Sequence, residues 1–209
     1  YINARPKFLS LGNRIGQHPG APCRAYGRCG CQLPKDAVSD VLTTPTGAAI
    51  VNMVNGAIAT GIANNTSFLL AGHDADVLIS TITMAAKSAS TGPTTSAFTF
   101  DQGTLDITTL DMVRNTGAYG GAASATVTIG GGTATIDTVN MALNSSSAAA
   151  TATANLNISG GNVTIGTGSG TAINMANASA SRTSTSDVNL TGGTVEMTGN
   201  IVRTGGAGT

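Results

Sequence analysis

Short arms in which apolar and polar residues alternate recur along the second part of the chain. Four segments follow one template, in which two such arms flank a turn that contains glycine. These segments are residues 98–107 (FTFDQGTLDI), 127–136 (VTIGGGTATI), 156–165 (LNISGGNVTI) and 188–197 (VNLTGGTVEM). A period of two is typical of β-strands rather than helices, and Val, Ile and Thr favour strands. The pattern therefore predicts short strands joined by tight turns.

The four copies align without gaps and carry apolar residues in the same four columns. The columns are Phe98, Val127, Leu156 and Val188; Phe100, Ile129, Ile158 and Leu190; Leu105, Ala134, Val163 and Val195; and Ile107, Ile136, Ile165 and Met197. The turn of each copy also contains a glycine, at Gly103, Gly132, Gly161 and Gly193. Glycine readily takes positive φ and allows two backbones to approach closely. We therefore expect these four glycines to form a structural turn in every copy.

A third short arm follows each copy and carries a methionine. Five of the six methionines fall in this one column, at Met53, Met84, Met112, Met141 and Met175. Successive copies start 29, 29 and 32 residues apart, and the longer step comes from an insertion at 166–171. We expect Gly166 and Gly168, in that insertion, to tolerate larger side chains better than the turn glycines do. A degenerate first copy at 68–79 brings the number of copies to about five.

A repeat of this length cannot bury its apolar face alone, so neighbouring copies must stack and share a core. The sequence therefore predicts an all-β protein, a parallel β-solenoid of about five coils over residues 46–209, preceded by an irregular N-terminal extension over residues 1–45. A propeller blade is longer and carries recurring aromatic residues. A β-sandwich has no reason to repeat at 29 residues.

Charge divides the chain into the same two parts. Residues 1–35 hold six basic and no acidic residues, whereas residues 36–209 hold four basic and ten acidic residues. We therefore expect the extension to act as a cap or as a strap against the acidic repeats. Its few aromatic residues do not suit nucleic-acid binding. No stretch of 18 apolar residues occurs, so no membrane span is predicted.

The extension also contains the candidate metal ligands, His18, Cys23, Cys29 and Cys31. Imidazole and thiolate groups are the ligands that zinc prefers, although zinc sites usually pair cysteines two to four residues apart. A disulfide from Cys23 to Cys29 or Cys31, and free thiols, are the alternatives. No metal or other cofactor is assigned.

Acidic residues do not form columns, which argues against an enzyme. Asp111 aligns with the amides Asn140 and Asn174. The only local cluster of titratable residues in the repeats is His73, Asp74 and Asp76. Polar residues of this kind are expected in a solvated turn. No nucleophile motif, phosphate-binding loop or dinucleotide fingerprint is present, so we assign no catalytic residue.

The doublets LNISGGNVTI and VNLTGGTVEM, with their methionine arms and Ser-, Thr- and Ala-rich loops, resemble the autotransporter-associated β-strand repeats of large secreted bacterial proteins. The resemblance covers roughly residues 48–209. It implies a bacterial extracellular or cell-surface protein, a structural stalk or adhesin segment without catalytic residues of its own. The partners expected on this reading are further coils of a longer chain, other copies of the chain stacked end to end into a filament, or surface glycans.

Two other functions are compatible with a solenoid. One is a glycan- or ice-binding module, and a less favoured one is a polysaccharide-degrading enzyme. Ice binding calls for a regular plane of threonines, but the column of Thr128 continues as Asn157 and Asn189. The absence of tryptophan weakens the case for a glycan-binding module.

Overall fold

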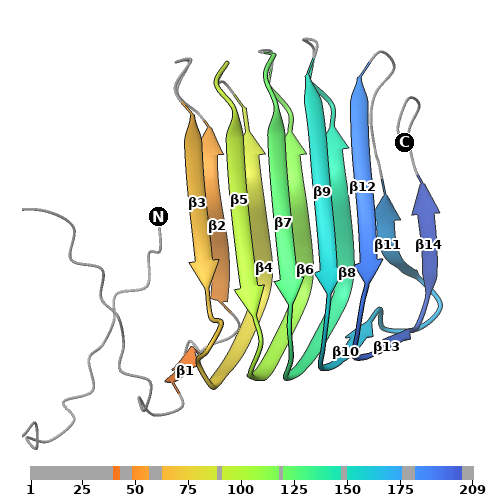
Figure 1. Ribbon diagram of the computed structural model, residues 1–209. Coiled ribbons are helices and arrows are strands. Elements are labelled where there is room, and N and C mark those ends of the chain that lie inside the picture. The colour runs from red at the N-terminus through yellow and green to blue at the C-terminus, as the bar shows by residue number, and fades with distance from the viewer. Residues whose placement is uncertain are drawn as a thin grey trace, which may run out of the picture.

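The computed structural model describes residues 40–42, 49–56, 63–88, 91–117, 120–146, 150–175 and 182–203. All elements in these ranges are β-strands, which confirms the predicted fold class (Figure 1). The strands are β1 (Asp40–Leu42), β2 (Ala49–Gly56), β3 (Asn64–Leu69), β4 (Ala75–Lys87), β5 (Thr94–Phe100), β6 (Gly103–Asn115), β7 (Ala123–Ile129), β8 (Thr133–Asn144), β9 (Thr151–Ile158), β10 (Asn162–Ile165), β11 (Thr171–Met175), β12 (Thr183–Leu190), β13 (Thr194–Met197) and β14 (Asn200–Arg203).

The strands form two parallel sheets that face each other across one core (Figure 1). The five-stranded sheet has the order β12-β9-β7-β5-β3, and each of its strands is the first arm of a copy. The nine-stranded sheet contains the second and third arms, which run together in the long strands β4, β6 and β8. The chain therefore winds from one sheet to the other about five times, as a parallel β-solenoid with a period of about 29 residues.

Pairing between coils reproduces the predicted columns. Phe100 pairs with Ile129, and Ile129 with Ile158, in the five-stranded sheet. Met84 pairs with Met112 in the nine-stranded sheet. All five side chains are fully buried. The core is therefore a set of inward ladders, each of which adds one residue per coil.

The turn glycines lie where the chain passes from the five-stranded to the nine-stranded sheet. Gly103, Gly132, Gly161 and Gly193 have φ values of +92°, +72°, +80° and +79°. A β-carbon added to Gly161 would lie 2.6 Å from the carbonyl oxygen of Gly132 in the coil below. Positive φ and close backbone approach are both found, so the predicted role of these glycines is confirmed.

The expected tolerance of Gly166 is wrong, whereas Gly168 lies in open space. Gly166 has a φ of +97°, and a β-carbon there would collide with the carbonyl oxygen of Thr198 in the next coil. A β-carbon at Gly168 meets nothing within 4 Å, although its φ is +135°. The insertion thus begins with a glycine that the stack requires, and only its later part is an open loop.

Alternation breaks twice in each long strand: two consecutive residues face outward between the second and third arms, as Thr108 and Thr109 do, and a second break follows directly after the methionine. The residues at this point have positive φ: Ala85 (+45°), Val113 (+67°) and Ala142 (+52°). Met112 and Val113 are consecutive and both are buried. Pairing then passes from Met84–Met112 to Ala86–Arg114. We call Ala85, Val113 and Ala142 the kink ladder, because the strands bend there in register and turn two neighbouring side chains toward the core.

The sheet begins before the predicted end of the N-terminal extension. Strand β1 lies within residues 1–45, and Asp40 pairs in parallel with Ala75 of β4. Hydrogen-bonded structure that continues the nine-stranded sheet therefore precedes Pro45 in the sequence. The basic residues of the extension, up to Lys35, lie outside the described residues.

Candidate functional site

The kink ladder opens a furrow on the outer surface of the nine-stranded sheet. In a regular strand every second side chain points outward. At the kink of β6 the outward residues are instead three positions apart, Asp111 and Arg114, because Met112 and Val113 both face the core. Since neighbouring strands carry the same kink in register, the uncovered backbone forms a strip that runs along the axis of the stack.

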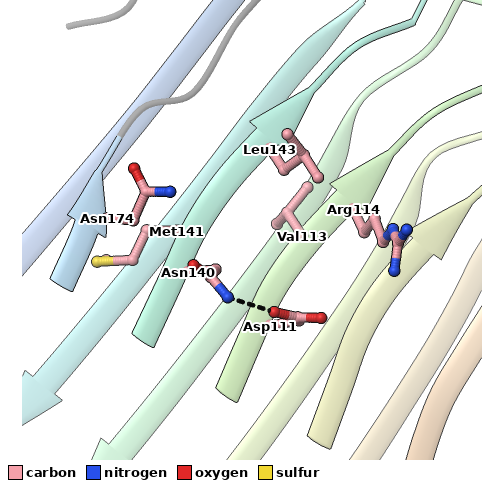
Figure 2. Close-up of a pocket in the computed structure, with 7 residues that line it drawn as sticks. All are labelled: Asp111, Val113, Arg114, Asn140, Met141, Leu143 and Asn174. Atoms are coloured by element: carbon pink, nitrogen blue, oxygen red, sulfur yellow. Dashed lines mark hydrogen bonds between the residues drawn. The ribbon is translucent and has the colours of Figure 1, made fainter. Parts of the chain in front are cut away.

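Side chains from three strands line this furrow (Figure 2). The cavity has a volume of about 260 Å³. One wall, which we call the polar wall, consists of Asp111, Asn140 and Asn174 from β6, β8 and β11, in one register. Arg114 and Leu143 stand on the opposite side. Val113 and Met141 complete the lining.

The polar wall combines hydrogen-bond donors with acceptors. The Asn140 Nδ2 atom donates to the Asp111 Oδ1 atom at 2.8 Å. This bond occupies only one carboxylate oxygen of Asp111 and only one of the two amide protons of Asn140. Both side chains are half-buried, and Arg114 is exposed. The wall can therefore accept and donate further hydrogen bonds to a polar ligand.

The side chains of the lining are mainly hydrogen-bonding groups. It contains one carboxylate and one guanidinium but no histidine, serine or cysteine. General acid–base catalysis needs a positioned proton donor and acceptor, and hydrolysis of a glycoside needs two carboxyl groups. Asp111 is paired in register with the amide Asn140 on one side and with Thr83 on the other, and not with a second acid. The arrangement thus offers hydrogen bonding and a locally balanced charge.

A second polar ladder lies inside the stack, at the end of the long strands. Lys87 is 1% exposed, and its Nζ atom donates to the carbonyl oxygens of Gly92 at 2.9 Å and Gly120 at 3.2 Å. Loss of hydration through burial lowers the pKa of Lys87 below its usual value. Asn115 pairs with Lys87 in register and is buried, and its side-chain amide has no hydrogen-bond partner among the described residues.

Asn144 continues this ladder and repeats the role of Lys87. Its Nδ2 atom donates to the carbonyl oxygens of Ala150 and Thr183, each at 3.0 Å. In both cases one acceptor belongs to the loop that follows the strand and the other to the next coil. The ladder therefore ties the returning loops of neighbouring coils together, which is a structural role.

The predicted cluster at His73, Asp74 and Asp76 is a turn. The backbone N–H of His73 donates to the carbonyl oxygen of Leu70 at 3.1 Å. Asp76 lies in β4 and accepts a hydrogen bond from the Thr104 hydroxyl of the next coil. Within the described residues no group of three His, Cys, Asp or Glu side chains could hold a metal ion.

The candidate metal ligands of the extension lie outside the described residues. This holds for His18, Cys23, Cys29 and Cys31. The zinc site, the disulfide and the free thiols therefore all stay open as predictions.

In the part of the chain that the structure describes, no helix could cross a membrane.

Sequence reasoning placed Asp111, Asn140 and Asn174 in one column but missed the furrow. The signal for it was a break in the alternation, an apolar residue directly after the column methionine, as in Met84-Ala85 and Met112-Val113. Two consecutive apolar residues in an alternating strand indicate that both face the core. The buried Lys87 carried no comparable signal, since lysine is almost never fully buried.

Comparison of the chain with protein-family models, curated proteins and solved structures gives no match. The resemblance to autotransporter-associated β-strand repeats therefore stays a prediction, as does the location outside the cell.

Proposed function

We propose that the chain is a non-enzymatic structural module of a bacterial cell-surface stalk or fibre, in which further coils stack on its last coil. The observation that supports this proposal is the exposure of core columns in the last described coil. Leu190, Met197 and Ile201 are 58%, 42% and 50% exposed. Their register partners in the coil below are Ile158, Ile165 and Ile173, all fully buried.

The backbone of the last coil is open in the same way. Among the described strands, β12 pairs only with β9, β13 only with β10, and β14 only with β11. An edge of unpaired N–H and C=O groups is a template for another strand. A further coil would pair with this edge and bury the exposed apolar columns, at about 25 cal/mol per Å² of apolar surface.

Two sources of that coil fit the proposal. In a stalk, the coil belongs to the same chain. In a fibre, it is the first coil of a second copy, and this head-to-tail contact repeats without closing. The first described coil suits the second role, because β2 pairs only with β4 and β3 only with β5 among the described strands. Phe68 of this coil is half-buried and continues the column of Phe98.

Sedimentation velocity over a range of protein concentrations tests the fibre. We expect species larger than a monomer, and we expect Leu190→Glu to shift the distribution to the monomer. Thr128→Glu is the control, because Thr128 is an outward residue in the middle of the five-stranded sheet and pairs in register with Thr99 and Asn157. A wild-type chain that stays monomeric at all concentrations contradicts the fibre. Equal effects of the two substitutions contradict the role of the end face.

The stalk is tested by lengthening the solenoid. A coil copied from residues 142–175 and joined after Arg203, which aligns with Met175 and Met141, should raise the thermal midpoint, because repeat proteins gain stability from each added interface. An unchanged or lower midpoint argues against an end face that accepts a coil. Calorimetry of the two chains measures the difference.

A further inference from the structure

The backbone pattern that forms the furrow continues along the stack beyond the cavity that three strands enclose. The kink ladder places the same backbone in β4, β6 and β8. Pairing of β2 with β4 also passes from Met53–Met84 directly to Asn55–Ala86, as expected for the same kink in β2. The polar wall continues in register as Asn52, Thr83, Asp111, Asn140 and Asn174. Five successive strands therefore place one polar side chain each in this column, which ends at Val202 of β14.

The spacing of these side chains suits a linear polymer. Neighbouring parallel strands lie about 4.8 Å apart, so the wall offers a hydrogen-bonding group at each such step. A small ligand could use two of these groups, whereas a polymer that lies along the stack could use all of them. A ligand in this position runs across the strands and not parallel to them.

The chemistry of the lining selects an uncharged, hydroxyl-rich ligand. Amide, hydroxyl and carboxylate groups on the polar wall can each bond a hydroxyl group, which both donates and accepts. The charges of Asp111 and Arg114 balance within the lining. The half-buried Leu143 adds apolar surface that can cover the carbon-bound face of a sugar ring. A nucleic acid would instead require several cations along its path.

The backbone strain that forms the furrow is also consistent with a ligand site. Val113 is β-branched and holds a φ of +67°, a conformation that such residues rarely adopt. Non-glycine residues in this region cluster at ligand-binding sites, where surrounding structure maintains the strain. Val113 lies in the lining, between Asp111 and Arg114 in the sequence.

From these observations we infer that the furrow binds a linear, uncharged polysaccharide, which lies along the axis of the stack and is hydrogen-bonded by the polar wall. This role is independent of stacking at the end face. It would make the module adhesive as well as structural, with one sheet of the solenoid carrying the binding surface.

Affinity gel electrophoresis of the full chain tests the inference. The native gels contain galactomannan, xyloglucan, mixed-linkage β-glucan or dextran, and a fifth contains the acidic polymer polygalacturonate. We expect at least one neutral polysaccharide to retard the chain. Replacing Asn140 and Asn174 together by alanine should reduce the retardation, because the affinity for the polysaccharide should fall about tenfold. This is the loss expected for two hydrogen bonds. Circular dichroism checks that the variant keeps its β signal.

The control is a matched pair on the opposite sheet. Asn157 and Asn189 are also neighbours in register, and their side chains are joined by a hydrogen bond of 2.9 Å on the outer surface of the five-stranded sheet. Replacing both by alanine should leave retardation unchanged. The inference is overturned if no neutral polysaccharide retards the chain, if only polygalacturonate does, or if both double variants bind equally. None of these results alters the sedimentation test of stacking.

Discussion

The two sheets of the solenoid differ although the same chain builds both, coil by coil. In the five-stranded sheet, β5, β7 and β9 alternate between buried and more exposed residues along their lengths. In the nine-stranded sheet, each long strand carries a residue with positive φ and turns two neighbouring side chains inward. The comparison shows that a strand inside a stack can depart from the alternation of inward and outward side chains when the neighbouring strands depart from it at the same position.

This departure has an energetic cost and a structural consequence. A left-handed backbone costs a residue with a β-carbon about 1–2 kcal/mol. The burial of an additional apolar side chain in each coil, such as Val113, offsets part of that cost. The consequence is a furrow on one sheet, whereas the outer surface of the other sheet is covered by outward side chains such as Thr128 and Asn157.

The largest effect is expected in the middle of the regular sheet. Ile129→Asp places a carboxylate at a fully buried position, where an unpaired charge is very unfavourable. We expect a loss of at least about 4 kcal/mol, enough to prevent cooperative folding. Thr128→Asp, at the preceding outward position, should change stability by only about 0.5 kcal/mol. Thermal melts followed by circular dichroism compare them, and similar midpoints would refute the alternation.

The corner between the two sheets should be the next most sensitive place. Gly161→Val combines positive φ with a collision between the new side chain and the backbone of Gly132, so we expect a loss of about 3 kcal/mol. Gly168→Val also strains the backbone but meets open space, and the loop can adjust. Urea unfolding measures both variants. Equal losses would show that contact between coils contributes nothing at the corner.

Much of this architecture follows from local sequence signals. The columns of Ile129 and Met112 could be predicted because the period of two recurs at a nearly fixed spacing, and Gly161 because a tight turn needs positive φ. Gly166 was misjudged because its constraint comes from Thr198, in another coil. The fold was thus predictable from the pattern, but contacts that only the stack creates were not.

The candidate site was less predictable for the same reason. The alignment of Asp111 with Asn140 was evident in the sequence, but the furrow beside them depends on the backbone angle of Val113. Similarly, the burial of Lys87 depends on carbonyl groups in two separate loops, at Gly92 and Gly120. The sequence of a single strand does not indicate which groups of neighbouring coils will contact it.

Lys87 should make the stability of the nine-stranded sheet depend on pH. The described inward residues of the five-stranded sheet include no titratable group of this kind. Burial lowers the pKa of Lys87 in the folded chain, while the unfolded chain keeps a value near 10.5. Between the two values the folded chain binds fewer protons, so the free energy of unfolding rises with pH. Below the folded pKa the penalty of burying the charge is fully present.

Urea unfolding of the wild-type chain and of Lys87→Met isolates this contribution. As the pH rises toward about 10.5, the wild-type chain should gain stability relative to the variant, because only the wild-type chain contains the titrating amine. The difference between the two chains removes the contribution of all other titrating groups. Parallel pH profiles would mean that the amine of Lys87 is hydrated in the folded chain.

The smallest effect compares the two sheets directly, through two alanines that are both fully buried. Ala142 belongs to the kink ladder with a φ of +52°, whereas Ala154 lies at a regular inward position of β9. Glycine at Ala154 loses a buried methyl group and adds chain entropy, at a cost of about 1–2 kcal/mol. Glycine at Ala142 carries the same cost but also relieves about 1–2 kcal/mol of left-handed backbone strain. The free energy of unfolding of the Ala142→Gly variant should therefore stay within about 0.5 kcal/mol of the wild-type value. Calorimetric midpoints of the two variants measure the contrast. Equal destabilisation would show that the kink stores no strain, and the two sheets would then differ in shape but not in energy.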